Sequence, residues 1–155
     1  MKNIFSLSCI FLLLTFVQNC FAIESPIGYW KTIDDVTGKP KAIVQISEAK
    51  DKTLVGQILK IYPEPGFDQN ETCAACPGSK HNQRIVGMTI LEGLAQNTDQ
   101  ANEWNNGKIL DPKNGKEYRC LIQTVDNGQK LNVRGYIGIA LFGRSQTWIR
   151  VKDAA

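Results

Sequence analysis

The sequence predicts an all-β protein that folds as one antiparallel β-barrel of eight strands. Short apolar or alternating segments follow one another along the chain, and turn signals separate them about every 8 to 12 residues. Thirteen Gly and six Pro residues in 155 supply many turns, which suit short strands better than long helices. The length fits a single hydrophobic core and leaves no room for a second one.

Residues 1–22 are predicted to be a secretory signal peptide. A short positive start, Met1 to Asn3, precedes an uncharged apolar run over residues 4–17. The run is shorter than the roughly 20 apolar residues of a membrane span. Cleavage after Ala22 would leave residues 23–155 as the barrel domain, periplasmic or secreted, with no transmembrane span. An uncleaved anchor and a lipoprotein acylated at Cys20 are the alternatives.

The first part of the mature chain is predicted to hold three consecutive strands. Residues 28–34 form the first strand, and the turn that follows, residues 35–39, contains Gly38. Two β-branched runs, residues 40–47 and 53–62, come next, and a polar connection joins them. We therefore expect these strands to be neighbours in one antiparallel sheet.

A long irregular loop separates these strands from the remainder of the chain. It runs from Pro63 to about Gln83 and contains Cys73 and Cys76. Residues 85–94 then return to apolar composition, and periodicity alone does not distinguish a strand from a short helix there.

The C-terminal half is predicted to form the remaining strands. Residues 108–111 and 116–125 flank Pro112-Lys113-Asn114-Gly115, where Pro and Asn-Gly suit a tight hairpin turn. A turn at Asp126-Asn127-Gly128 leads into two more strands, residues 129–135 and 144–151.

The two ends of the mature chain carry matching aromatic and cationic residues. Gly28-Tyr29-Trp30 opens the first strand, and Trp148-Ile149-Arg150 lies in the last one. In a closed barrel these strands are neighbours, so an indole from one and a guanidinium from the other could stack. This arrangement resembles the lipocalin and calycin barrels, in which a G-x-W tryptophan is capped by a late arginine.

Several further motifs occur in a fixed order along the mature chain. They are residues 28–35, residues 37–40, the C-x-x-C loop, and residues 104–112, 131–138 and 142–148. Taken together they resemble the exported bacterial family catalogued as domain of unknown function 2147. The resemblance spans about residues 27–151. It implies a small periplasmic or secreted protein with a lipocalin-like barrel, and it leaves the function open.

Composition and motifs argue against several functional classes. The formal charge of +3 and the lack of any Lys/Arg cluster longer than two residues disfavour nucleic acid as a partner. The chain has no G-x-S-x-G, H-E-x-x-H or phosphate-loop motif. Asp34 and Asp35 are adjacent strand residues that face opposite sides, so a turn-stabilising role is expected for them instead of acid–base catalysis. No catalytic residue and no cofactor is predicted.

The cysteines of an exported protein are expected to meet an oxidising compartment. Cys73 and Cys76 are therefore predicted to form a local disulfide, with Cys120 as a buried thiol. A redox-active pair is disfavoured because Pro77-Gly78 follows the second cysteine. The alternative is a metal- or thiol-dependent protein in which Cys73, Cys76, His81 and Cys120 form a zinc site.

The last strand carries the most suggestive group of polar residues. Arg144, Gln146, Trp148 and Arg150 share one face by alternation. One hypothesis is noncatalytic binding of a small amphipathic or anionic ligand, or of a cell-envelope partner. Its ligand-binding residues are expected to be Trp30, Arg134, Arg144, Gln146 and Trp148. The alternative is a filled barrel in which Asp34 or Glu117 pairs with the arginines.

Residues 136–142, Tyr-Ile-Gly-Ile-Ala-Leu-Phe, are almost entirely apolar. Burial as a lid is the outcome we expect, since exposed apolar loops are uncommon. The alternatives are a plug, a cover over a portal, or an apolar patch for a partner or membrane surface.

Overall fold

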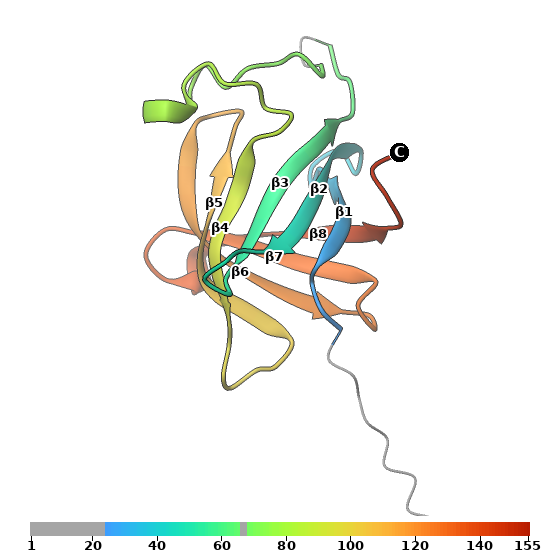
Figure 1. The fold of residues 1–155 in the computed structure, drawn as a ribbon, viewed down its shortest axis with the longest axis vertical. Helices are drawn as coiled ribbons and strands as arrows, with labels where there is room; N and C mark the ends of the chain where they lie inside the picture. Colours follow the sequence, from blue (N-terminus) through green and yellow to red (C-terminus); the bar gives the residue numbers. More distant parts are fainter. Residues whose placement is uncertain (1–23, 66–67) are drawn as a thin grey trace, which may run out of the picture.

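The structure, a computed structural model, describes residues 24–65 and 68–155. The predicted signal peptide lies outside the described residues. The described residues form one closed barrel of antiparallel strands, each paired with its neighbour in sequence (Figure 1). The strands are β1 (Gly28–Ile33), β2 (Pro40–Glu48), β3 (Leu54–Ile61), β4 (Thr89–Gln96), β5 (Glu103–Asp111), β6 (Lys116–Val125), β7 (Lys130–Tyr136) and β8 (Arg144–Val151). The predicted all-β, eight-stranded antiparallel barrel is confirmed.

The first and last strands close the barrel, as the sequence predicted. Strands β1 and β8 pair antiparallel, and Trp30 lies opposite Arg150. Closure pairs every strand on both sides, so the sheet has no exposed edge. The Arg150 guanidinium lies 4.3 Å from the centre of the Trp30 ring, and the predicted stacking of indole and guanidinium is present.

Alternating side chains fill the interior. In β6, for example, Cys120, Ile122 and Thr124 are buried and the residues between them are more exposed. This period of two is the geometry of a strand with one face on the core. The described residues also include two short 3₁₀ turns, η1 (Gly78–Lys80) and η2 (Ala140–Phe142). Among the described residues, no helix has the length and hydropathy needed to cross a membrane.

The barrel has two different ends. We call the end where β1 begins and β8 finishes the closed end, because Trp30 and Arg150 seal it. The Trp30 indole donates a hydrogen bond to the Pro26 carbonyl, 2.7 Å away. Arg150 donates to three backbone carbonyls, those of Ser25, Ile27 and Gly128. The opposite end, where β1 finishes and β8 begins, is the open end.

The structure decides one open point of the sequence prediction and corrects one boundary. The apolar segment at residues 85–94, which the sequence left open between a strand and a short helix, leads into strand β4 from Thr89. Strand β5 begins at Glu103, earlier than the predicted residue 108, because a bulge near Asn106 and Gly107 accommodates its polar stretch. A Cβ at Gly107 would approach the Leu94 side chain to 2.5 Å, so this position needs glycine for close packing.

The long β3–β4 connection, coloured green, arches over one end of the barrel in Figure 1. Ile85 from this connection is buried in the core. A bridge between Thr72 and Arg84 ties the two arms of the connection together. The connection therefore covers part of the open end, which is where the candidate site lies.

Candidate functional site

The open end of the barrel contains a cavity of about 470 Å³. This volume falls within the roughly 300–1,000 Å³ range of small-molecule sites. The wall of the cavity is mainly apolar, and all eight strands and the β3–β4 connection contribute residues to it. Its main apolar residues are Val44, Ile58, Ile61, Ile85, Val133 and Trp148. The barrel is thus filled at its closed end and hollow at its open end.

Charged side chains surround the rim of the cavity in balanced numbers. The cations are Lys41, Lys113 and Arg144, and the anions are Asp34, Glu64 and Asp111. Lys41 lies 3.3 Å from the Asp34 carboxylate, which compensates its charge. A rim with both signs of charge does not by itself attract a simple anion, and the electrostatics favour a ligand with a mixed polar group.

Asp34 caps the β1–β2 turn. One of its carboxylate oxygens accepts hydrogen bonds from the backbone N–H groups of Val36 and Thr37 and from the Thr37 hydroxyl. These donors stabilise the charged form and hold the pKa of Asp34 well below its ordinary value. The turn-stabilising role expected for Asp34 is confirmed.

Asp35 connects that turn to the start of β8. The Arg144 guanidinium donates to both oxygens of the Asp35 carboxylate, a two-point pairing that fixes its orientation. This pairing lowers the pKa of Asp35 and raises that of Arg144. The sequence proposed Asp34 or Glu117 as the arginine's partner. The observed partner is Asp35, and Glu117 instead pairs with Lys108.

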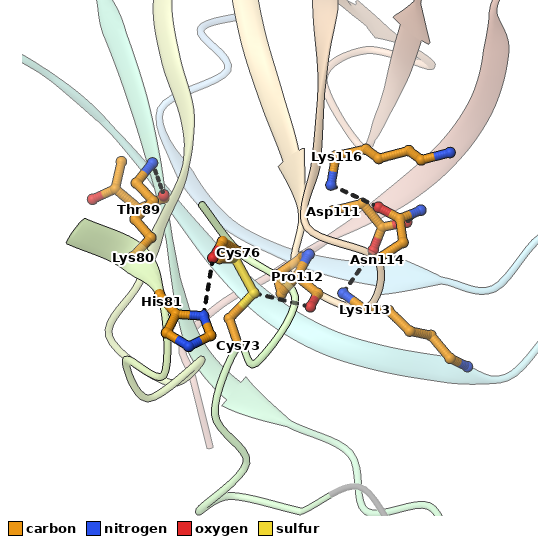
Figure 2. The surroundings of a disulfide bond; sticks show 10 residues. All are labelled: Cys73, Cys76, Lys80, His81, Thr89, Asp111, Pro112, Lys113, Asn114 and Lys116. Carbon is orange, nitrogen blue, oxygen red and sulfur yellow. Dashed lines mark hydrogen bonds between the residues drawn. A yellow bond between two sulfur atoms is a disulfide. The ribbon is translucent and has the colours of Figure 1, made fainter. Parts of the chain in front are cut away.

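Cys73 and Cys76 form the predicted disulfide, with their Cα atoms 5.3 Å apart. Figure 2 shows the disulfide between His81 and Pro112 of the β5–β6 turn. The Cys73 sulfur lies 3.1 Å from the Pro112 carbonyl oxygen. A Cβ at Gly115 would overlap the Ala75 backbone, so the cysteine loop rests directly on this turn. The disulfide thereby fixes one side of the cavity rim.

The alternative zinc site is not assembled. The disulfide occupies Cys73 and Cys76, and the His81 ring lies 3.3 Å from the Cys76 carbonyl oxygen. Cys120 is a buried thiol in β6, and burial raises its pKa to about 12. Across residues 24–65 and 68–155, no group of three or more His, Cys, Asp or Glu residues is placed to hold a metal ion. The geometry therefore does not support the alternative of a four-residue zinc site.

The structure brings three of the five predicted ligand-binding residues to the cavity. Arg144, Gln146 and Trp148 line it from alternate positions of β8. Trp30 is buried at the closed end, away from the cavity lining. Arg134 does not line the cavity either. Val133 and Gly135 take the inward positions of β7, so Arg134 faces outward.

The prediction that residues 136–142 are buried as a lid is wrong. Ile137, Ile139, Leu141 and Phe142 are all exposed on the connection between β7 and β8. Arg134 holds this connection from the outer face of the barrel, with its guanidinium donating to the Ala140 and Leu141 carbonyls. The segment lies beside the cavity rim: Gly135 and Arg144 at its two ends line the cavity, and none of residues 136–142 does.

Sequence reasoning missed several residues of the cavity. Tyr118 lines it and could have been found by extending the alternation of Cys120 and Ile122 toward the open end. Ile85 and Glu64 come from the long connection, which has no periodicity that would reveal where it folds back. These two could not be placed from the local sequence.

Comparisons with known proteins agree with this architecture. The sequence profile of a family described as "Uncharacterized protein conserved in bacteria (DUF2147)" matches residues 28–150. The chain belongs to this family. The family resemblance predicted from the sequence motifs is thus confirmed, and the matched residues of this DUF2147 protein span all eight strands.

A solved structure has the same fold as this DUF2147 protein. It is the protein HP1028 from Helicobacter pylori, described as belonging to the lipocalin family. The TM-score is 0.69 at 18% sequence identity, over 83% of this chain and 84% of that one. At this identity the likeness concerns the fold, and it confirms the predicted lipocalin-like barrel. A search of curated proteins returned no match.

Proposed function

We propose that the protein binds a small amphipathic molecule in the open end of its barrel and carries out no chemical step on it. The observation that carries the proposal is the cavity of about 470 Å³ with an apolar wall and a polar rim. Ligand sites commonly combine mostly apolar walls with a few polar groups that orient the ligand. The apolar part of the ligand would displace water from the depth of the barrel.

The rim determines which polar group fits best. Lys41 and Arg144 already have the carboxylates of Asp34 and Asp35 as partners. A bare anion would compete with these carboxylates, whereas a head group with both donors and acceptors can use cations and carboxylates together. We therefore favour an amphipathic ligand with a zwitterionic or neutral polar head over a simple anion.

The proposed location is the periplasm or the exterior of the cell. Two features support it: the signal-peptide pattern over residues 1–22, and the disulfide between Cys73 and Cys76. Structural disulfides persist in oxidising compartments and are rare in the reducing cytosol. Cell fractionation with an antibody against the protein would test this assignment.

Native mass spectrometry of protein purified from its own host tests the binding proposal. A co-purified small molecule is the expected result, and titration calorimetry with dodecanoic acid and lysophosphatidylcholine follows it. Gly135→Leu provides the blocking variant, since a Cβ at Gly135 makes only ordinary contacts of 3.4 Å or more and the added side chain enters the cavity. We expect this variant to weaken binding by about tenfold or more.

A matched control is Gln123→Leu, which adds the same side chain on the outward face of neighbouring β6. Its affinity should equal that of the unaltered protein. Two results would overturn the proposal: no co-purified or added amphiphile bound by the unaltered protein, or equal affinities for Gly135→Leu and Gln123→Leu.

A further inference from the structure

The connection between β7 and β8 presents four large apolar side chains to solvent. Ile137, Ile139, Leu141 and Phe142 are exposed by 74%, 59%, 76% and 80%. We call residues 137–142 the apolar loop. Single exposed apolar residues are ordinary on protein surfaces, but a contiguous group usually marks an interaction site.

The apolar loop is held in this conformation by hydrogen bonds. Arg134 donates from Nε to the Ala140 carbonyl at 2.6 Å and from Nη2 to the Leu141 carbonyl at 2.9 Å. Its third donor, Nη1, binds the Ser145 hydroxyl at 2.7 Å. The bonds fix the backbone of η2 while the side chains of Leu141 and Phe142 stay in water. A loop ordered in this way has its apolar groups ready for a partner.

The position of the loop places it at the mouth of the cavity. Gly135 and Arg144 flank the loop in sequence, pair with each other between β7 and β8, and line the cavity. The pairing of Arg144 with Asp35 also brings the β1–β2 turn to the same rim, and Val36 of that turn is exposed by 81%. Two neighbouring connections at the open end thus carry exposed apolar side chains.

Two arginines without a carboxylate partner among the described residues lie beside the loop. Arg119 is exposed on β6 and pairs in register with Tyr136, the last residue of β7. Arg134 has only neutral oxygens as hydrogen-bond partners. Within the described part of the chain, neither arginine forms a salt bridge. The arrangement of protruding apolar side chains backed by cations matches the interface of an anionic bilayer, in which acyl chains lie beneath phosphate groups.

We propose that the apolar loop docks the open end of the barrel on an anionic phospholipid bilayer. Leu141 and Phe142 insert among the upper acyl groups, and Arg119 and Arg134 face the lipid phosphates. A short protruding loop suits insertion into a fluid surface better than a specific protein contact, which typically covers about 800 Å² on each partner. This proposal depends on the apolar loop and on Arg119 and Arg134, and it does not depend on a ligand in the cavity.

Vesicle flotation tests docking with the purified protein. We use vesicles of phosphatidylethanolamine with phosphatidylglycerol and, in parallel, vesicles of phosphatidylcholine alone. The protein is expected to float with the anionic vesicles, to do so less at high salt, and to remain mostly unbound with phosphatidylcholine. The double variant Leu141→Ser/Phe142→Ser should lose about tenfold or more in partitioning. Arg119→Gln should reduce partitioning a few-fold, and only with the anionic vesicles.

The control is Ile27→Ser, which removes an exposed apolar side chain from the closed end. It should float like the unaltered protein, and thermal melts should show that all variants are folded. Failure to float with anionic vesicles, or equal flotation of the double variant, would overturn the proposal. Size-exclusion chromatography tests whether a protein binds the loop instead. A dimer or protein complex that the double variant abolishes would show that the loop binds a protein and would overturn the bilayer proposal.

Discussion

The two ends of the barrel are built by the same strands, but one is filled by side chains and the other contains a cavity. Interior positions change from large to small or polar toward the open end. In β1 the order is Trp30 then Thr32, with Asp34 just after the strand, and in β7 it is Leu131, Val133 and Gly135. Strand β8 follows the same trend in reverse chain direction, from Trp148 back through Gln146 to Arg144. Because eight-stranded barrels have just enough interior for side chains, reducing side-chain volume at one end leaves a cavity there.

The difference between the two ends also indicates which residues stabilise the fold and which are available for binding. At the closed end, Arg150 donates to three backbone carbonyls and covers the Trp30 ring, so these two side chains close the core there. At the open end, Lys41 and Arg144 form ion pairs with Asp34 and Asp35 at the surface, and several apolar side chains remain in water. Substitutions at the closed end should therefore affect mainly folding, and those at the open end mainly binding.

The largest effect is expected from Trp30→Ala. The indole is fully buried and its N–H donates to the Pro26 carbonyl, so truncation leaves both a cavity and an unpaired carbonyl. We expect a loss of about 3–5 kcal/mol in the free energy of unfolding. Urea denaturation measures it, and Trp30→Phe provides a milder variant if the alanine protein does not fold. A loss of less than about 1 kcal/mol for both variants would contradict the sealing role.

A smaller loss is expected from Arg150→Ala at the same end. The substitution removes the partner of the Ser25, Ile27 and Gly128 carbonyls together with the stacking on Trp30. We expect about 2–4 kcal/mol in denaturant unfolding. Arg150→Lys should recover only part of this, because an ammonium group lacks the planar fork that reaches several carbonyls. Full recovery by lysine would show that charge alone matters.

Much of this architecture could be predicted from the sequence, for physical reasons. Alternation identifies β6 and β8 with their correct bounds, and matching aromatic and cationic residues at the chain ends predict closure. Alternation also identifies Arg144, Gln146 and Trp148 as residues of one face. It fails for Arg134, whose long polar side chain looked suited to the cavity but falls on the outward parity of β7.

The long connection and the apolar loop could not be predicted in the same way. Their positions depend on contacts between residues far apart in sequence, such as the cysteine loop against Pro112 and Gly115. The apolar loop was expected to be buried because apolar composition normally means burial. Hydrogen bonds from Arg134 hold the loop in its exposed conformation. The local sequence does not show which way the Arg134 side chain points, so these bonds could not be predicted.

The disulfide gives a prediction of intermediate size that is specific to the open end. The double variant Cys73→Ala/Cys76→Ala should lose about 2 kcal/mol or less, because the closed loop is short. Hydrogen exchange should rise in the β3–β4 connection and in the β5–β6 turn on which the cysteine loop rests. Exchange in β1 and β8 near Trp30 should not change. An equal rise throughout the barrel would indicate that the two ends are not independent.

The smallest effect on the free energy of unfolding is expected from replacing the carboxylates of Asp34 and Asp35 at the open rim. The folded-state pKa of Asp34 lies below its ordinary value of 3.8, owing to the donors of Val36 and Thr37, and Arg144 lowers that of Asp35. A lowered folded pKa means that the charged carboxylate contributes stability above the unfolded pKa and loses it as the pH falls through the folded pKa.

Asp34→Asn should therefore be less stable than the unaltered protein above about pH 5, and the difference should shrink as the pH falls below 3.8. Urea unfolding across this pH range measures it. Asp35→Asn should behave in the same way, with a smaller difference that added salt reduces, since its partner Arg144 is mostly exposed. A difference that stays constant with pH would mean that hydrogen bonding alone, and not ionisation, holds the open rim. In that case acid would leave the mouth of the cavity as intact as the closed end.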